Sequence, residues 1–253
     1  MKNRRLAWLT PVHCGLWPGF VVAALGVACG LVSSDITKVS FDLPAKFYRF
    51  DTQDTGWKAA DTMKFGTVPA ISCTTDADCC PPAVAALGLD CSSIVCDVPP
   101  GTATCAFALT IETPPQTIDL KMEVPQVSSI SSQNILDIAI SKITYQVTEN
   151  SLNVDLPPVD LFLADNGATS TLDPSAVQFG TVPVIPRMTK IDNGNVTLLQ
   201  PAAKDAFNKI GHHLGTPFVF IARSRVLVAG GTPVPSGALS ITVGGRLSAQ
   251  PGL

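Results

Sequence analysis

The stretch Ile138-Ala-Ile-Ser-Lys-Ile-Thr-Tyr-Gln-Val147 decides the fold class. Apolar and polar residues alternate up to Ile140, and the alternation resumes at Ile143 after a slip of one residue at Ser141-Lys142. A period of two places successive side chains on opposite faces of a β-strand. A slip of one residue is what a β-bulge produces. The stretch therefore predicts a long strand with one face buried and a bulge near its middle.

The same period recurs along most of the chain, and Gly and Pro punctuate nearly every gap between the alternating segments. Many short strands separated by turn residues are typical of a sandwich or barrel. We expect an all-β fold, an antiparallel β-sandwich with one short helix over residues 201–214. The alternating segments that support this lie at residues 36–50, 107–111, 118–122, 138–147, 152–163, 218–228 and 239–243.

Composition excludes several classes of protein. The chain has 253 residues, with 17 Lys plus Arg against 20 Asp plus Glu, and a formal net charge of -3. A nucleic-acid-binding protein normally shows a basic excess, so we expect no nucleic acid partner. The length allows one large domain or two small ones.

The first residues have the organisation of a secretory signal. Lys2, Arg4 and Arg5 precede an apolar run that is strongest over residues 20–28. A positive start, a short apolar region and small residues before a cleavage point define such signals. The run is too short to span a bilayer, which needs about 20 apolar residues. We therefore expect residues 1–28 to be a signal peptide.

The end of that segment, Leu25-Gly-Val-Ala-Cys-Gly30, resembles the lipobox of bacterial lipoproteins. In that family the Cys after a small-residue site is acylated and becomes the new N-terminus, which implies lipidation of Cys29. Gly26 departs from the family pattern, because Leu usually lies three residues before the Cys. The resemblance implies a lipoprotein of the cell envelope that is anchored through acylated Cys29. We expect this anchor to lie in the outer membrane. The alternative is an ordinary signal cleaved near Ala28.

Six cysteines lie close together in the predicted exported chain, at Cys73, Cys79, Cys80, Cys91, Cys96 and Cys105. An even number of clustered cysteines in an exported protein indicates three disulfides, whose pairing has fifteen possibilities. We expect residues 73–105 to form a disulfide-rich insert in a sandwich body made of 29–72 and 106–253. A zinc cluster is the alternative, although the spacing lacks a C-x-x-C pair and no His is near.

Two carboxylates within the predicted insert, Asp76 and Asp78, raise the question of calcium. Calcium needs six to eight oxygen ligands, whereas closely spaced Asp residues commonly form turns through bonds to their own backbone. We therefore expect turn formation and no metal. A stapled, loop-rich segment is rigid and exposed, so the insert is the expected contact surface for a partner.

Residues 133–245 weakly resemble the water-stress domain of type 2 late-embryogenesis-abundant proteins. The resemblance rests on the opening stretch, on Val182-Pro-Val-Ile-Pro186 and on Pro233-Val-Pro-Ser-Gly-Ala-Leu239. It implies a β-sandwich without catalytic residues. The sequence also repeats Phe-Gly-Thr-Val-Pro at 65–69 and 179–183, which suggests two related β units as one interpretation and chance recurrence as the other.

No catalytic motif stands out. The sequence has no nucleophile elbow, zinc-protease motif or nucleotide-binding loop. We expect a non-enzyme without a cofactor, with a structural or partner-binding role toward an unknown protein or glycan. Tyr48 and Trp57 are the candidates for contact with a glycan ligand, although core or edge positions fit them as well.

Two alternatives stay open beside that expectation. A lipid-binding sandwich predicts an open apolar cavity between the sheets. A glycan or cell-wall hydrolase predicts paired carboxylates with separated pKa values. Arg223 and Arg225 should share one strand face, where they form either a solvated surface or, with Arg246, a small basic patch.

Overall fold

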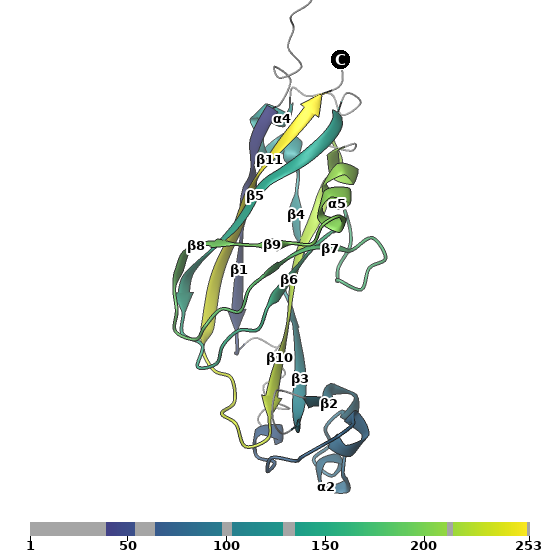
Figure 1. Cartoon of the computed structure of the whole chain (residues 1–253), viewed down its shortest axis with the longest axis vertical. Helices are drawn as coiled ribbons and strands as arrows, with labels where there is room; N and C mark the ends of the chain where they lie inside the picture. The colour runs from purple at the N-terminus through teal and green to yellow at the C-terminus, as the bar shows by residue number, and fades with distance from the viewer. Residues whose placement is uncertain (1–38, 54–63, 98–102, 129–134, 212–214, 252–253) are drawn as a thin grey trace, which may run out of the picture. The chain divides into compact units, whose positions relative to one another are not determined.

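The computed structural model describes residues 39–53, 64–97, 103–128, 135–211 and 215–251. All of these residues belong to the unit Thr37–Leu253. Signal residues 1–28, Cys29 and Trp57 lie outside the described residues, so their predicted roles remain predictions. The expected all-β antiparallel fold is confirmed, because the unit contains two antiparallel sheets and only short helices (Figure 1).

The smaller sheet joins the two ends of the described chain. Its first and last strands pair from Val39 opposite Ala249 to Asp51 opposite Ala238. The long strand Ile135–Asn150 lies on the other side of the last strand of the chain. The short strand Ile191–Asn195 pairs with it and forms the edge of the sheet. In sheet order the members are β1 (Val39–Asp51), β11 (Ala238–Pro251), β5 (Ile135–Asn150) and β8 (Ile191–Asn195).

The larger sheet is built around β10 (Phe218–Ala229), which pairs with β6 on one side and with both β3 and β4 on the other. Between β3 and β4, the Thr113 hydroxyl, in place of a backbone carbonyl, accepts from the Ala222 N–H at 3.0 Å. In sheet order the other members are β2 (Ile94–Asp97), β3 (Thr104–Glu112), β6 (Val159–Asp165), β7 (Val177–Val182) and β9 (Thr197–Leu198), with β4 (Gln116–Ile118) beside β10.

The predicted bulge lies where the sequence pattern slips. Lys142 pairs with Arg246 and Ile140 pairs with Leu247, so Ser141 is the extra residue on β5. The bulge restores the alternation, because Ile143 then points into the core with 3% of its side chain exposed. The local prediction from the sequence is therefore confirmed at the level of a single residue.

Both open sides of the sandwich are closed by short connections between the sheets. On one side β8 and β9 follow each other with only Val196 between them, so this stretch passes from the small sheet to the large one. On the other side Lys46 of β1 donates to the carbonyl of Thr117 in β4 at 3.2 Å. Its ammonium also pairs with Glu123 at 2.9 Å.

Aromatic rings fill the space between the sheets. The Phe220 ring lies 5.7 Å from Tyr48 of the opposite sheet and 5.3 Å from Phe179, and Phe207 lies 5.4 Å from Phe179. Such pairs stabilise a core beyond their buried area. The space left beside Phe207 and Phe220 is only about 10 Å³. The interior is therefore filled, and the open cavity between the sheets that a lipid-binding sandwich predicts is not found among the described residues.

The predicted helix is α5 (Ala202–Gly211), within the expected range of 201–214. Its apolar side buries Ala203, Ala206 and Phe207, which recur at three- and four-residue spacing. The other helices are short: η3 (Asp76–Cys79), α2 (Pro82–Ala85), η4 (Cys91–Ser93), α3 (Leu120–Glu123) and α4 (Pro125–Ser128).

The disulfide-rich segment 73–105 is continuous with the sandwich. Strand β2 inside it is the edge strand of the large sheet and pairs with β3 from Ile94 opposite Phe107 to Asp97 opposite Thr104. Val84 and Leu89 of the segment belong to the same core cluster as the sandwich interior. The segment therefore differs from a separate insert that depends on disulfides alone, because it shares the apolar core.

The repeated pentapeptide does not mark two equivalent β units. Residues 64–66 form a helical turn, whereas the second copy lies in β7. Both copies bury their phenylalanine, Phe65 and Phe179, with 0% exposure. The shared feature is thus an apolar anchor before a Pro, and the interpretation as a duplicated strand is wrong.

Candidate functional site

Three disulfides hold the segment 73–105. Cys73 pairs with Cys96, Cys79 with Cys105 and Cys80 with Cys91, at Cα separations of 5.8, 5.3 and 5.7 Å. These separations lie within the usual range for disulfides. The predicted set of three disulfides is confirmed, and the neighbouring Cys79 and Cys80 bond to different partners.

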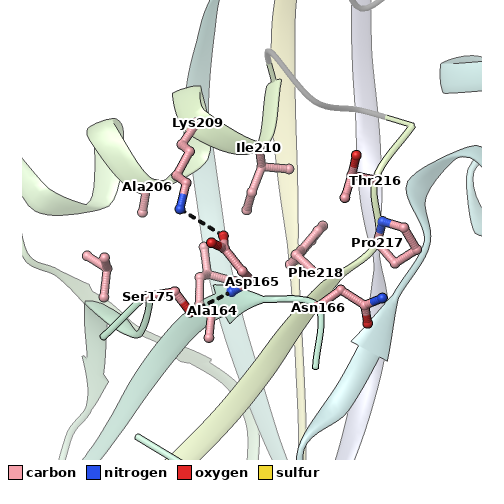
Figure 2. Close-up of a pocket in the computed structure, with 12 residues that line it drawn as sticks. Ala164, Asp165, Asn166, Ser175, Ala206, Lys209, Ile210, Thr216, Pro217 and Phe218 are labelled. Atoms are coloured by element: carbon pink, nitrogen blue, oxygen red, sulfur yellow. Dashed lines mark hydrogen bonds and ion pairs between the residues drawn. The ribbon is translucent and has the colours of Figure 1, made fainter. Parts of the chain in front are cut away.

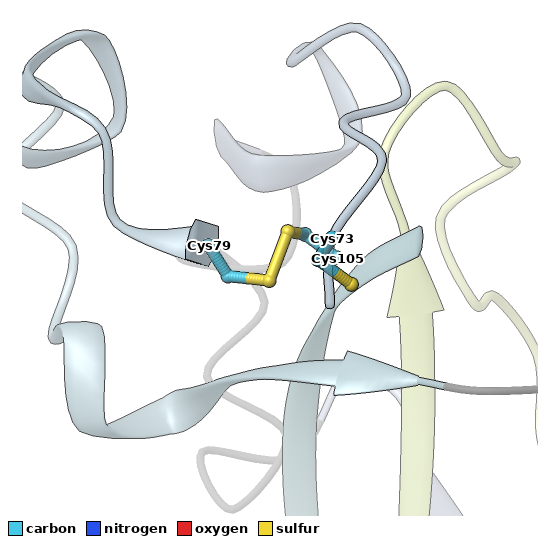
Figure 3. Close-up of side chains that lie close together, drawn as sticks. All are labelled: Cys73, Cys79 and Cys105. Carbon is cyan, nitrogen blue, oxygen red and sulfur yellow. A yellow bond between two sulfur atoms is a disulfide. The ribbon is translucent and has the colours of Figure 1, made fainter. Parts of the chain in front are cut away.

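The alternative of a zinc cluster finds no support in this arrangement. Cys73, Cys79 and Cys105 lie close together (Figure 3), and their sulfur atoms are within 4.8 Å of one another. Zinc binds thiolates, however, and all three sulfurs are already bonded in disulfides. The cluster is the point where two disulfides cross inside the core.

Asp76 and Asp78 serve the backbone. Asp78 Oδ2 accepts from the N–H groups of Thr74 and Thr75, both at 2.9 Å, and these bonds lower its pKa from 3.8 to about 2. Asp76 Oδ1 accepts from the Cys96 N–H at 2.7 Å. That bond occupies a donor of the edge strand β2, which would otherwise be open to another strand. The interpretation as a turn former is confirmed for Asp78, whereas Asp76 bonds to strand β2, twenty residues further along the chain.

Tyr48 is not a surface platform for a glycan. Its side chain is 2% exposed and packs on Phe220 between the sheets, so the prediction that it contacts a ligand is wrong. Tyr48 takes the core position that the sequence left open as an alternative, on the same face of β1 as the buried Phe50. The buried hydroxyl has no hydrogen-bond partner among the described residues, and burial raises its pKa.

A surface cavity of about 380 Å³ lies between α5 and the ends of β6 and β10 (Figure 2). Its floor is apolar, from Ala206, Ile210 and Phe218, and its rim is polar. At the rim the Lys209 ammonium pairs with Asp165 at 2.8 Å, and Ser175 accepts from the Asp165 N–H at 3.0 Å. This volume falls in the range of small-molecule sites.

The cavity has the features of a binding site. The side chains of Lys209 and Asp165 are both more than half exposed, so their ion pair adds little to stability. The sequence does not reveal the cavity, because Lys209 lies in the predicted helix 201–214 and Asp165 follows the predicted alternating segment 152–163. Only the docking of α5 beside β6 brings the two residues together.

The carboxyl groups with displaced pKa values do not form an acid and base pair. Hydrogen bonds to Arg246 lower the pKa of Asp42, and hydrogen bonds to Gln53 and Arg49 lower that of Asp51. A glycosidase acid needs a raised pKa. The displaced carboxyl groups of the described residues therefore do not favour the hydrolase alternative.

Within the described part of the chain, no helix is both long and apolar enough to cross a bilayer. No family model and no curated protein matches the sequence. One solved structure, titled Desmodium yellow mottle tymovirus, aligns over 100% of this chain and 97% of its own at 10% identity, with a TM-score of 0.20. A score this low carries no argument about fold or function.

Proposed function

We propose that this chain is an exported, non-catalytic protein of the bacterial cell envelope that is anchored by acylated Cys29 and binds a protein or glycan partner. The observation that supports the proposal best is the disulfide-rich segment. Its six cysteines form three pairs, and two of these pairs, Cys73–Cys96 and Cys79–Cys105, belong to the sandwich core. Such pairing persists in oxidising compartments, to which the signal at residues 1–28 would deliver the chain.

Chain connectivity gives the proposal an orientation. Only nine residues lie between Cys29 and Val39, the first residue of β1. An extended chain of that length reaches at most about 35 Å. In Figure 1 the beginning of β1 and the end of β11 lie at one end of the sandwich, and the disulfide-rich segment lies at the opposite end of β3 and β10. The proposed anchor would therefore hold the sandwich through the end at which β1 begins, and the disulfide-rich segment lies at the other end of the sandwich.

A second candidate function is binding of a small apolar ligand. The cavity beside α5 favours it, since about 380 Å³ of space lies above an apolar floor. A binding titration, in which the fluorescence of a naphthalene sulfonate dye is followed as protein is added, tests this candidate. Replacing Ala206 with Trp should abolish dye binding, and an unchanged titration would reject the cavity as a site.

The primary proposal is tested by the intact mass of the protein purified from membranes, before and after reduction. We expect a chain that begins at Cys29 and carries added acyl mass. Reduction should add six hydrogens, two for each of the three disulfides. A chain without acyl mass would refute the anchor, and free thiols within residues 73–105 would refute the assignment to an oxidising compartment.

A further inference from the structure

A polar groove of about 430 Å³ crosses the outer face of the large sheet next to the disulfide-rich segment. Four separate elements supply its polar lining, and the strand register brings three of them together, β3, β6 and β10. Arg225 faces Thr110 on β3, and Arg223 faces Asp160 on β6. Ser92 and Ser93 of η4 complete the lining, held in place by the Cys80–Cys91 disulfide and by the Asp90 side chain, which accepts from the Ser92 N–H at 2.9 Å.

One side of the groove is fixed before any ligand arrives. The Arg223 guanidinium lies 4.9 Å from the centre of the Phe162 ring and donates to the Thr171 hydroxyl at 3.1 Å. Thr171 donates in turn to Glu112 at 2.6 Å. A side chain held by a cation–π contact and a hydrogen bond loses little entropy when it binds. Arg223 is therefore a preorganised wall of the groove.

Arg225 is the group available to a ligand. Its side chain is exposed, and it makes no hydrogen bond or ion pair with the described residues. A guanidinium presents parallel N–H donors that match a carboxylate. Arg246, which the sequence analysis considered for the same patch, lies in the other sheet and pairs with Asp42 at 2.8 Å. The basic patch therefore consists of the two arginines on β10.

Asp160 decides the rest of the ligand chemistry. Its Oδ1 accepts from Gln178 at 2.8 Å and from Thr181 at 3.2 Å, while its Oδ2 accepts nothing from the described residues. This carboxylate would repel a ligand that carries only negative charge. It would accept from a ligand hydroxyl, as would the hydroxyls of Ser93 and Thr110 on the opposite side.

We propose that this groove binds an acidic saccharide, with the ligand carboxylate on Arg225 and ligand hydroxyls on Asp160 and the neighbouring Ser and Thr side chains. The inference rests on the proposed partner-binding function and names its ligand class. It also places the contact at the junction of the sandwich and the disulfide-rich segment, where one disulfide and one sheet fix all of the lining residues.

The test is calorimetric titration of the whole protein with trigalacturonate, using cellotriose as the neutral control. Arg225→Gln removes the available guanidinium from an exposed position, and circular dichroism verifies its fold. Arg187→Gln is the matched control, because Arg187 is also exposed but does not line the groove. We expect Arg225→Gln to weaken trigalacturonate binding about tenfold or more, the effect of losing a hydrogen-bonded charge pair. Arg187→Gln should change binding by less than about twofold.

Three outcomes overturn the inference. Wild-type protein that fails to bind trigalacturonate at about 10 mM has no such site. Equal weakening by the two variants indicates a general charge effect. Cellotriose that binds as tightly, or inorganic phosphate that displaces trigalacturonate at equal concentration, shows that the carboxylate or the saccharide is not what is recognised. The mass measurement of the anchor is independent of all three, so failure here leaves the envelope proposal separately testable.

Discussion

The disulfides Cys79–Cys105 and Cys80–Cys91 should differ in what they contribute to stability. The first closes a separation of 26 residues and the second one of 11. Loop-closure entropy alone assigns them about 3.5 and 2.8 kcal/mol at 25 °C. The larger difference comes from packing, because Cys79 and Cys105 are 0% and 1% exposed and lie in the core cluster. Deleting two buried sulfurs costs about another 1.5 kcal/mol.

Two double variants measure this difference. Replacing Cys79 and Cys105 by Ala should lower the free energy of unfolding by about 5 kcal/mol, and replacing Cys80 and Cys91 by Ala should lower it by about 3 kcal/mol. Urea denaturation followed by circular dichroism gives both values under non-reducing conditions. An equal loss in the two variants, or a larger loss for Cys80 and Cys91, would refute the argument that the segment shares the core.

Three further substitutions test the local structure. Tyr48→Phe removes a buried hydroxyl that has no partner among the described residues, so it should stabilise the fold by about 1 kcal/mol and raise the urea midpoint; a lower midpoint would show that the hydroxyl is bonded. Because the Asp78 pKa is about 2 in the fold against an ordinary 3.8, its stabilisation is present at neutral pH and is lost as pH falls between those values. Asp78→Asn should flatten the stability profile there, and an unchanged profile would contradict this assignment. Gly237 has a φ of 106°, and an added Cβ would meet the Ser151 carbonyl, so Gly237→Ala should cost about 2 kcal/mol in thermal or urea denaturation, whereas an unchanged midpoint would contradict that geometry.

The sequence predicts the long strands well because their signal is local, but the alternation over 118–122 is misleading, since Leu120–Glu123 forms α3, and residues 152–155 form no strand. A period of two, a slip at Ser141 and turn residues at the gaps depend only on neighbours in the chain, and β5 reproduces all of them. The single helix has the same origin, since Ala203 and Phe207 lie four residues apart before a Gly and a Pro. Which strands pair, and that β1 lies beside β11, depends on long-range packing that no local pattern encodes.

The disulfide-rich segment shows where composition misleads. Six cysteines within 33 residues suggest a unit that depends on its disulfides, because short segments seldom bury a core. Val84 and Leu89 instead contact the interior of the large sheet, and β2 extends that sheet by one strand. The pentapeptide at 65–69 also shows that local sequence does not decide the structure, since identical residues form a helical turn in one context and a strand in the other.

The groove on the outer face depends partly on local sequence pattern and partly on long-range packing. That Arg223 and Arg225 share a face follows from the period of β10 alone. Their different states do not, because Phe162 and Thr171 fix one guanidinium while the other stays available. Asp160 and Thr110 join them only through the register of three strands, and Ser93 only through a disulfide. Binding in this groove therefore depends on the folded arrangement of the sheet and of η4. Removal of the Cys80–Cys91 disulfide should weaken saccharide binding even though neither cysteine lines the groove.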